Sequence, residues 1–135
     1  SKKAGALVPW LRPKKLAKDD TSSVDVALHA LDWYEKSIGK VDGLLLLQPT
    51  TPFRKKSTIT DAINLFKKKS FKQVVSVSKN KKMIANGAIY LTSPEKLRKF
   101  KTFTYIDFIP LAINSKKESI DINTVQDLNL ARSYL

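Results

Sequence analysis

Apolar and polar positions follow two rhythms along the chain, one typical of helices and one typical of strands. Apolar residues spaced three and four positions apart predict helices that begin near residues 23, 58, 94 and 124. Short apolar runs predict strands at residues 43–47, 74–77, 87–91 and 105–113. Because the helices separate most of the strands, the order predicts an α/β fold with a mostly parallel sheet and helices on both faces.

The run 43–47 contains no polar residue, so we expect a strand that is buried on both faces in the middle of the sheet. Pro110 places the last strand at an edge or interrupts it. Ligands of such sheets bind at the carboxyl ends of the strands. Two polar loops are expected there, at residues 48–54 and 121–123.

Length and composition fit one domain, 1–135, with an ordinary core: the chain has 135 residues, of which 42% are hydrophobic. The chain has no cysteine, which excludes disulfides, thiolate metal sites and a cysteine nucleophile. No run approaches the roughly 20 apolar residues of a membrane span, and the basic start lacks the apolar core of a signal peptide. We therefore expect a cytoplasmic protein with no membrane contact.

The net charge of +13 suggests a nucleic-acid partner, because lysine and arginine displace counterions from phosphates. Only four of the 25 basic residues are arginines, however, and arginine is the residue favoured for bidentate phosphate contacts and base recognition. The short lysine runs fit solvated helix ends and turns at least as well. We expect a solvated surface and keep a small basic nucleic-acid-binding module as the alternative.

Several familiar sites are excluded by residue counts. Four glycines form neither a Walker loop nor a dinucleotide fingerprint. His29 is the chain's one histidine and falls within a predicted helix, so neither a histidine zinc site nor a Ser-His-Asp set is expected. We expect His29 to be a packing or helix-surface residue.

Two strings could carry chemistry. The string from Gln48 to Arg54 contains two prolines and is either a stiffened turn or a rigid polar platform for a hydroxylated ligand. Asp121 and Asn123 alternate with apolar residues and should lie on one side of a short strand. Two such oxygen donors suit Mg²⁺, or they cap the helix that follows, and spacing does not separate these alternatives.

Five strings, in this order, resemble the acylneuraminate cytidylyltransferases, the CMP-sialic acid synthetases and their relatives for other nonulosonic acids. The strings are Arg12–Asp19 with Thr21–Ser23, His29–Leu31, Leu47–Arg54, Asn86–Tyr90 and Glu118–Thr124. The resemblance implies a nucleotidyltransferase fold related to the Rossmann type and a homodimer. It also implies that CTP and a nine-carbon sugar acid react, with Mg²⁺, to give a CMP-sugar and pyrophosphate.

Matched position by position, the resemblance assigns Arg12 and Ser23 to the nucleotide. It assigns Gln48 and Tyr90 to the sugar acid, and Phe103 to the sugar's acyl group.

The same matching makes Asp121 a metal-binding, catalytic carboxylate. Asn123 stands where the family usually has a second aspartate, so this second metal ligand carries one negative charge fewer.

Two family features have no counterpart in the sequence: the N-terminal triphosphate-binding segment and most of the dimerisation arm. The sequence is then either that of a shortened homologue, even an inactive one, or the joined parts of a longer chain. We expect the second, with a break between Lys79 and Ala85, because a missing first strand would leave the strand at 43–47 poorly covered.

Overall fold

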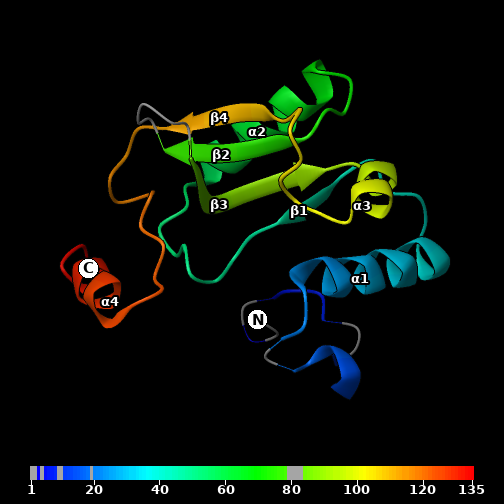
Figure 1. The fold of residues 1–135 in the computed structure, drawn as a ribbon, viewed down its shortest axis with the longest axis horizontal. Coiled ribbons are helices and arrows are strands. Elements are labelled where there is room, and N and C mark those ends of the chain that lie inside the picture. Colours follow the sequence, from blue (N-terminus) through cyan, green and yellow to red (C-terminus); the bar gives the residue numbers. More distant parts are fainter. Residues whose placement is uncertain (1–2, 4, 9–10, 19, 79–83) are drawn as a thin grey trace.

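A computed structural model describes residues 3, 5–8, 11–18, 20–78 and 84–135 of the chain (Figure 1). The strands of its sheet are β1 (Leu44–Leu46), β2 (Val74–Ser78), β3 (Ala85–Thr92) and β4 (Ile109–Ile113). The helices are α1 (Ser23–Ser37), α2 (Lys56–Lys68), α3 (Pro94–Phe100) and α4 (Val125–Arg132), and a short 3₁₀ helix, Lys14–Leu16, precedes α1. None of the helices in these ranges has both the length and the apolar character that crossing a membrane requires.

The sheet is open and mixed, with the strand order β1-β3-β2-β4. Strand β3 runs antiparallel to both β1 and β2, whereas β4 pairs parallel with β2. The prediction of a mostly parallel sheet is therefore wrong. Strands β2 and β3 are antiparallel because the connection between them is short. The Ser78 N–H at its start donates to the Ile84 carbonyl at its end, at 3.0 Å. A connection this short returns the chain antiparallel, since parallel strands need a crossover of a dozen residues or more.

Helices cover both faces of the sheet, as predicted. Leu44 and Leu46 of β1 pack with α1, α3 and Phe103 on one face. Leu45 packs on the other face with α2, including Phe66. This division follows from the two-residue period of a strand, which sends successive side chains to opposite faces.

The leucine strand does not lie in the middle of the sheet. It is an edge strand whose residues are half-buried, and Leu47 is 37% exposed. The prediction of a central strand buried on both faces is wrong. An apolar run predicts that the two faces of a strand are covered, but it does not predict whether both hydrogen-bonding edges have a neighbouring strand. Strand β4, which carries Pro110, lies at the other edge, as its proline predicts.

Local capping signals locate three of the helix starts. The Ser22 hydroxyl accepts from the Val24 N–H and caps α1. The Ser93 hydroxyl accepts from the Lys96 N–H and caps α3. Thr124 forms the predicted capping box of α4 with its partner three residues later. In each case a side-chain oxygen satisfies a backbone donor that the first turn of a helix leaves free.

Helix α2 begins two residues before the predicted Thr58 and has no side-chain cap of its own. Thr58 instead donates its hydroxyl to Glu118, which is 60 residues away in the sequence. The buried Glu118 carboxylate also accepts from the Lys55 N–H at 3.2 Å. A distant carboxylate thus replaces the local cap, which the spacing of Thr58 and its neighbours does not reveal.

The expected break between Lys79 and Ala85 falls largely on residues 79–83, outside the described residues.

Candidate functional site

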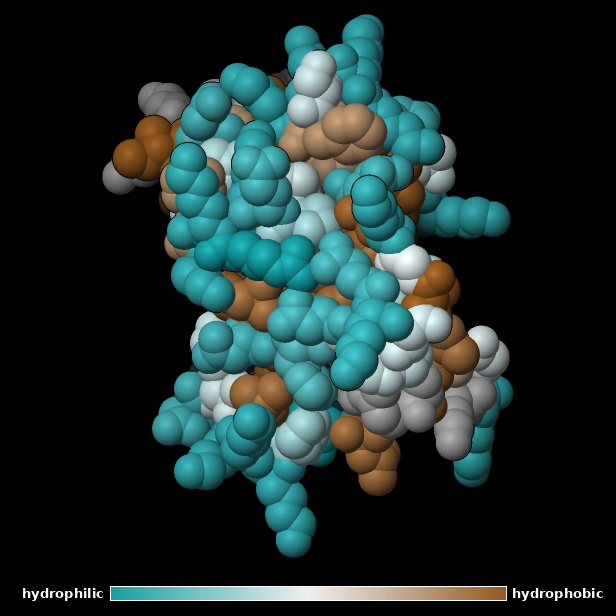
Figure 2. Space-filling model, turned by 90° about the vertical axis from the view of Figure 1, so that its right-hand side faces the viewer, coloured by the Kyte–Doolittle hydropathy of each residue, from teal (hydrophilic) through white to brown (hydrophobic). Residues whose placement is uncertain are grey.

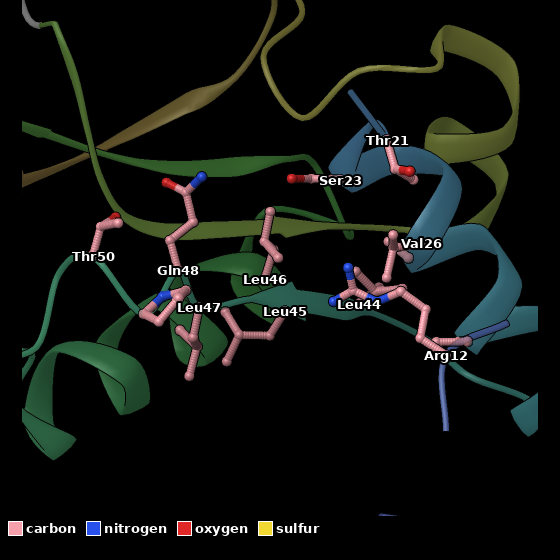
Figure 3. Close-up of a pocket in the computed structure, with 13 residues that line it drawn as sticks. Arg12, Thr21, Ser23, Val26, Leu44, Leu45, Leu46, Leu47, Gln48 and Thr50 are labelled. Atoms are coloured by element: carbon pink, nitrogen blue, oxygen red, sulfur yellow. The ribbon is translucent and has the colours of Figure 1, made fainter. Parts of the chain in front are cut away.

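A cavity of about 460 Å³ lies beside β1, where the strand ends and the chain enters the loop at 48–54 (Figure 3). Its lining includes Arg12 from the segment before α1, Ser23 from the first turn of α1, and Gln48. These three residues are predicted separately as nucleotide and sugar contacts, and the fold brings them to one space. The leucines of β1 supply the apolar part of the lining (Figure 3).

The loop after β1 is a turn held by its own polar groups. Both the N–H and the hydroxyl of Thr51 donate to the Gln48 carbonyl, at 3.3 and 3.1 Å. The Arg54 guanidinium donates from Nη2 to the same carbonyl at 2.6 Å and from Nε to the Ala88 carbonyl of β3 at 2.6 Å. Burial lowers the pKa of Arg54 from its ordinary value. Both alternatives for this string therefore describe part of it: it is a stiffened turn, and it presents Gln48 to a cavity.

Strand β3 has a bulge at the site. Its pairing with β2 shifts register between the pairs Val75–Tyr90 and Val77–Ala85. Gly87 lies within the extra length, with a φ of +77° that side-chain-bearing residues rarely adopt. Bulges of this kind occur next to active sites, where they redirect the chain.

The side chains of Gln48 and Asp121 both approach Gly87. A Cβ atom at Gly87 would lie 3.1 Å from Gln48 Oε1 and 3.3 Å from Asp121 Oδ2. Asp121 arrives there because the Ile122 N–H donates to the Thr50 carbonyl at 2.8 Å, which joins its segment to the loop after β1. The absent side chain of Gly87 leaves room for both polar groups.

Asp121 and Asn123 face each other but do not lie in a strand. The Asn123 amide donates to Asp121 Oδ2 at 2.9 Å, and the segment is held by contacts to the loop instead of by a ladder. The predicted strand is therefore wrong, although the two side chains are in direct contact. Asp121 lines a second cavity, of about 660 Å³, which Lys116 and Asp127 also line.

The Asp121 carboxylate fits a cation. Its Oδ1 atom is buried and has no hydrogen-bond partner within the described part of the chain. A buried carboxylate oxygen without a partner is costly, and a metal ion would remove that cost. No group of three or more His, Cys, Asp or Glu residues that could hold a metal occurs in the described ranges. Mg²⁺ needs no such cage, because it binds through one or two carboxylates and substrate phosphates and keeps several waters.

Tyr90 is half-buried on the same strand as Gly87. Burial raises the pKa of the Tyr90 phenol, the charge of Asp121 raises it further, and a backbone hydrogen bond at Gly87 lowers it. Phe103 is 7% exposed and its ring centroid lies 6.1 Å from that of Tyr90. The structure therefore places Tyr90 near Asp121 and Phe103 next to Tyr90, and neither aromatic residue is part of the lining of the first cavity.

Two contributors to the site were not among the predicted site residues: Arg54 and Gly87. Arg54 and Gly87 belong to the strings that carry the family resemblance, and a glycine within an apolar strand is a known sign of a bulge. His29 lies in α1, partly buried, and is not part of the lining of the first cavity.

Comparison with curated proteins finds relatives whose names describe CMP-sugar synthesis or cytidylyl transfer. A CMP-N,N'-diacetyllegionaminic acid synthase of Legionella pneumophila subsp. pneumophila is 31% identical over 163 residues, a match that covers 97% of this chain and 70% of that protein. An N-acylneuraminate cytidylyltransferase of Escherichia coli O18:K1:H7 is 38% identical over 73 residues, covering 53% of this chain and 16% of that protein. No model of a protein family matches the chain.

An open α/β sheet with a cavity at the end of a strand is the arrangement in which many α/β proteins bind ligands. Because the Legionella relative is matched over most of both sequences, the chain belongs to the acylneuraminate cytidylyltransferase family. The resemblance inferred from the five strings is thereby confirmed. The match of 163 residues is longer than the 135 residues of this chain, so the relative has residues with no counterpart here.

Proposed function

We propose that the protein is a cytidylyltransferase that joins CMP from CTP to a nonulosonic acid and releases pyrophosphate. The observation that carries this proposal is the convergence of Arg12, Ser23 and Gln48 on one cavity. The names of both relatives support this chemistry. The nucleotidyltransferase fold and a homodimeric assembly are part of the same proposal, by analogy with the family.

In this proposal the anomeric hydroxyl oxygen of the sugar bonds to the α-phosphorus of CTP. The bond from that phosphorus to the bridging oxygen breaks, pyrophosphate leaves with the electron pair, and the hydroxyl proton passes to solvent. Such transfer depends on positioning and on neutralising charge. Arg12 and Ser23 hold the nucleotide, and Gln48 orients the sugar acid. Tyr90 and Phe103 do not line this cavity, and the family resemblance alone assigns them to the sugar acid and its acyl group.

Asp121 would hold Mg²⁺ through its buried, unpartnered oxygen, and the Asn123 amide oxygen could serve as a neutral second ligand. When bound, the metal neutralises triphosphate charge and polarises the phosphorus that is attacked. The contact from Asn123 to Asp121 is a neutral hydrogen bond, so it leaves the charge of the carboxylate for a cation.

The direct test uses the purified full-length protein with CTP, MgCl₂ and a panel of nine-carbon acids that includes N-acetylneuraminic and N,N'-diacetyllegionaminic acids. We expect pyrophosphate release that requires both CTP and one of the acids, with the CMP-sugar identified by mass spectrometry. ATP, GTP and UTP serve as controls for the base. Absence of any CMP-sugar with every acid of the panel, from protein that binds CTP, would overturn the proposal and favour an inactive homologue.

A further inference from the structure

The ladder between β1 and β3 stops where the site begins. Its pairs run from Leu44–Thr92 to Leu46–Tyr90, and the same register continued by two residues would set Gln48 opposite Ala88. That pair is not formed, because β3 enters its bulge there and Gly87 takes a positive φ. The chain after Leu46 therefore needs another connection to β3 if Gln48 is to keep a fixed position.

Arg54 supplies that connection. Its Nε donates to the Ala88 carbonyl at 2.6 Å, and its Nη2 donates to the Gln48 carbonyl at 2.6 Å and to Thr51 Oγ1 at 2.5 Å. One planar guanidinium thus joins the two backbone carbonyls that the interrupted ladder leaves opposite each other. Thr51 is completely buried, and its hydroxyl, whose one proton is directed to the Gln48 carbonyl at 3.1 Å, also lies 3.5 Å from the Gly87 carbonyl of the bulge.

We propose that Arg54 is a positioning residue: it fixes the Gln48 backbone against the β3 bulge and thereby presents the Gln48 amide to the sugar acid. This inference rests on the proposed function. Arg54 acts through Gln48 and makes no ligand contact of its own in this role, since its Nε and Nη2 atoms are used by protein acceptors. Its low hydration and rigid fork suit a partly buried bridge between two carbonyls better than an ammonium group does.

The conservative variant Arg54→Lys is the sharpest probe, because it keeps the charge but cannot hold both carbonyls in the geometry of a planar fork. We expect the KM for the sugar acid to rise about tenfold, the change that loss of one paired polar contact produces, while the KM for CTP stays within twofold. A purely structural role predicts a different pattern: a smaller folded fraction lowers the apparent kcat and leaves both KM values unchanged.

Arg98→Lys is the matched control. Arg98 donates from Nη2 to Asp32 at 2.6 Å and to Glu35 at 2.7 Å, so it also bridges two acceptors, but it joins α3 to α1 away from the cavity. We expect its KM values for both substrates to equal those of the wild-type protein.

A double-mutant cycle on the full-length protein tests whether Arg54 acts through Gln48. In the Gln48→Ala background, Arg54→Lys should change the sugar-acid KM by less than twofold. Effects that multiply in the double variant, or an unchanged sugar-acid KM in Arg54→Lys alone, would overturn the inference. If Arg54→Lys does not fold, Thr51→Val, which removes one acceptor of the bridge, must raise the sugar-acid KM severalfold, and an unchanged KM overturns it equally. A wild-type protein that makes no CMP-sugar would instead refute the proposed function.

Discussion

At the scale of single residues, the feature that most directly indicates function is the Asp121 carboxylate. One of its oxygens accepts from Asn123, whereas the other is buried without a partner among the described residues. A charge in that position costs free energy in the unliganded protein. Such a cost is expected at a site whose partner is a bound cation.

Asp121→Asn should remove Mg²⁺-dependent turnover, by about 100-fold or more, since the metal contributes several kcal/mol to the transition state. The melting temperature should change little, because asparagine has the same shape and keeps an oxygen that accepts from the Asn123 amide. Turnover measured against Mg²⁺ concentration, together with a melting curve, checks both statements. Asp127→Asn is the control in the same cavity: it weakens the capping box of α4, so it should lower the melting temperature and keep turnover. Near-normal turnover in Asp121→Asn would refute the metal assignment.

Gln48→Ala should raise the KM for the sugar acid and lower kcat/KM tenfold or more, because a paired polar contact is worth about 1–3 kcal/mol when its partner is left buried. Steady-state kinetics with each substrate varied in turn measure the effect. Gln126→Ala, at an exposed position of α4, should leave both constants unchanged. Equal KM values in Gln48→Ala and the wild-type protein would contradict the sugar-binding role.

At the scale of elements, the helix starts that depend on neighbouring residues were predicted from the sequence, and the one that depends on a distant contact was not. Ser22, Ser93 and Thr124 cap their helices through neighbours within a few residues, so spacing located them. The start of α2 depends on Glu118, about 60 residues away, which no window of the sequence contains.

The sheet shows the same division. The existence of each strand followed from its apolar run, whereas the insertion of β3 between β1 and β2 depends on a short connection whose residues resemble any polar loop. Of the site, the family resemblance named Arg12, Ser23 and Gln48 one by one, and the fold brings them to one cavity. The bridge from Arg54 to Ala88 was not predicted, because it joins residues 34 positions apart.

Gly87→Ala tests the bulge as an element of the site. A Cβ atom there would meet Gln48 and Asp121 at 3.1 and 3.3 Å, and the φ of +77° adds backbone strain of about 1–2 kcal/mol. We expect lower stability and a fall in kcat/KM of tenfold or more, because both polar groups must move. Gly5→Ala is the control: Gly5 has a φ of +79°, and a Cβ atom added to it would meet nothing within 4 Å, so strain acts without displacement. Equal losses of activity in the two variants would show that displacement of Gln48 and Asp121 is unimportant.

At the scale of the whole molecule, the net charge of +13 needs an explanation that agrees with the site. Hydrophilic side chains are spread over the face shown in Figure 2, with apolar side chains scattered among them. A distribution of this kind fits solvated lysines, which also attract an anionic triphosphate from a distance. The comparisons with known proteins give the nucleic-acid alternative no support.

Binding measured at two salt concentrations separates the two explanations of this charge. A protein that neutralises six to ten phosphates of a nucleic acid loses about 10³–10⁵ in affinity between 50 and 200 mM salt. CTP bound with a metal ion at Asp121 should instead lose more than tenfold in affinity when Mg²⁺ is chelated at constant ionic strength, and less than that over the same salt range. Calorimetric titrations of the full-length protein with CTP, and with single- and double-stranded oligonucleotides, measure both dependences. Two results together would favour the nucleic-acid module over the cytidylyltransferase. They are submicromolar oligonucleotide binding that persists at 200 mM salt, and a CTP affinity that does not change when Mg²⁺ is chelated.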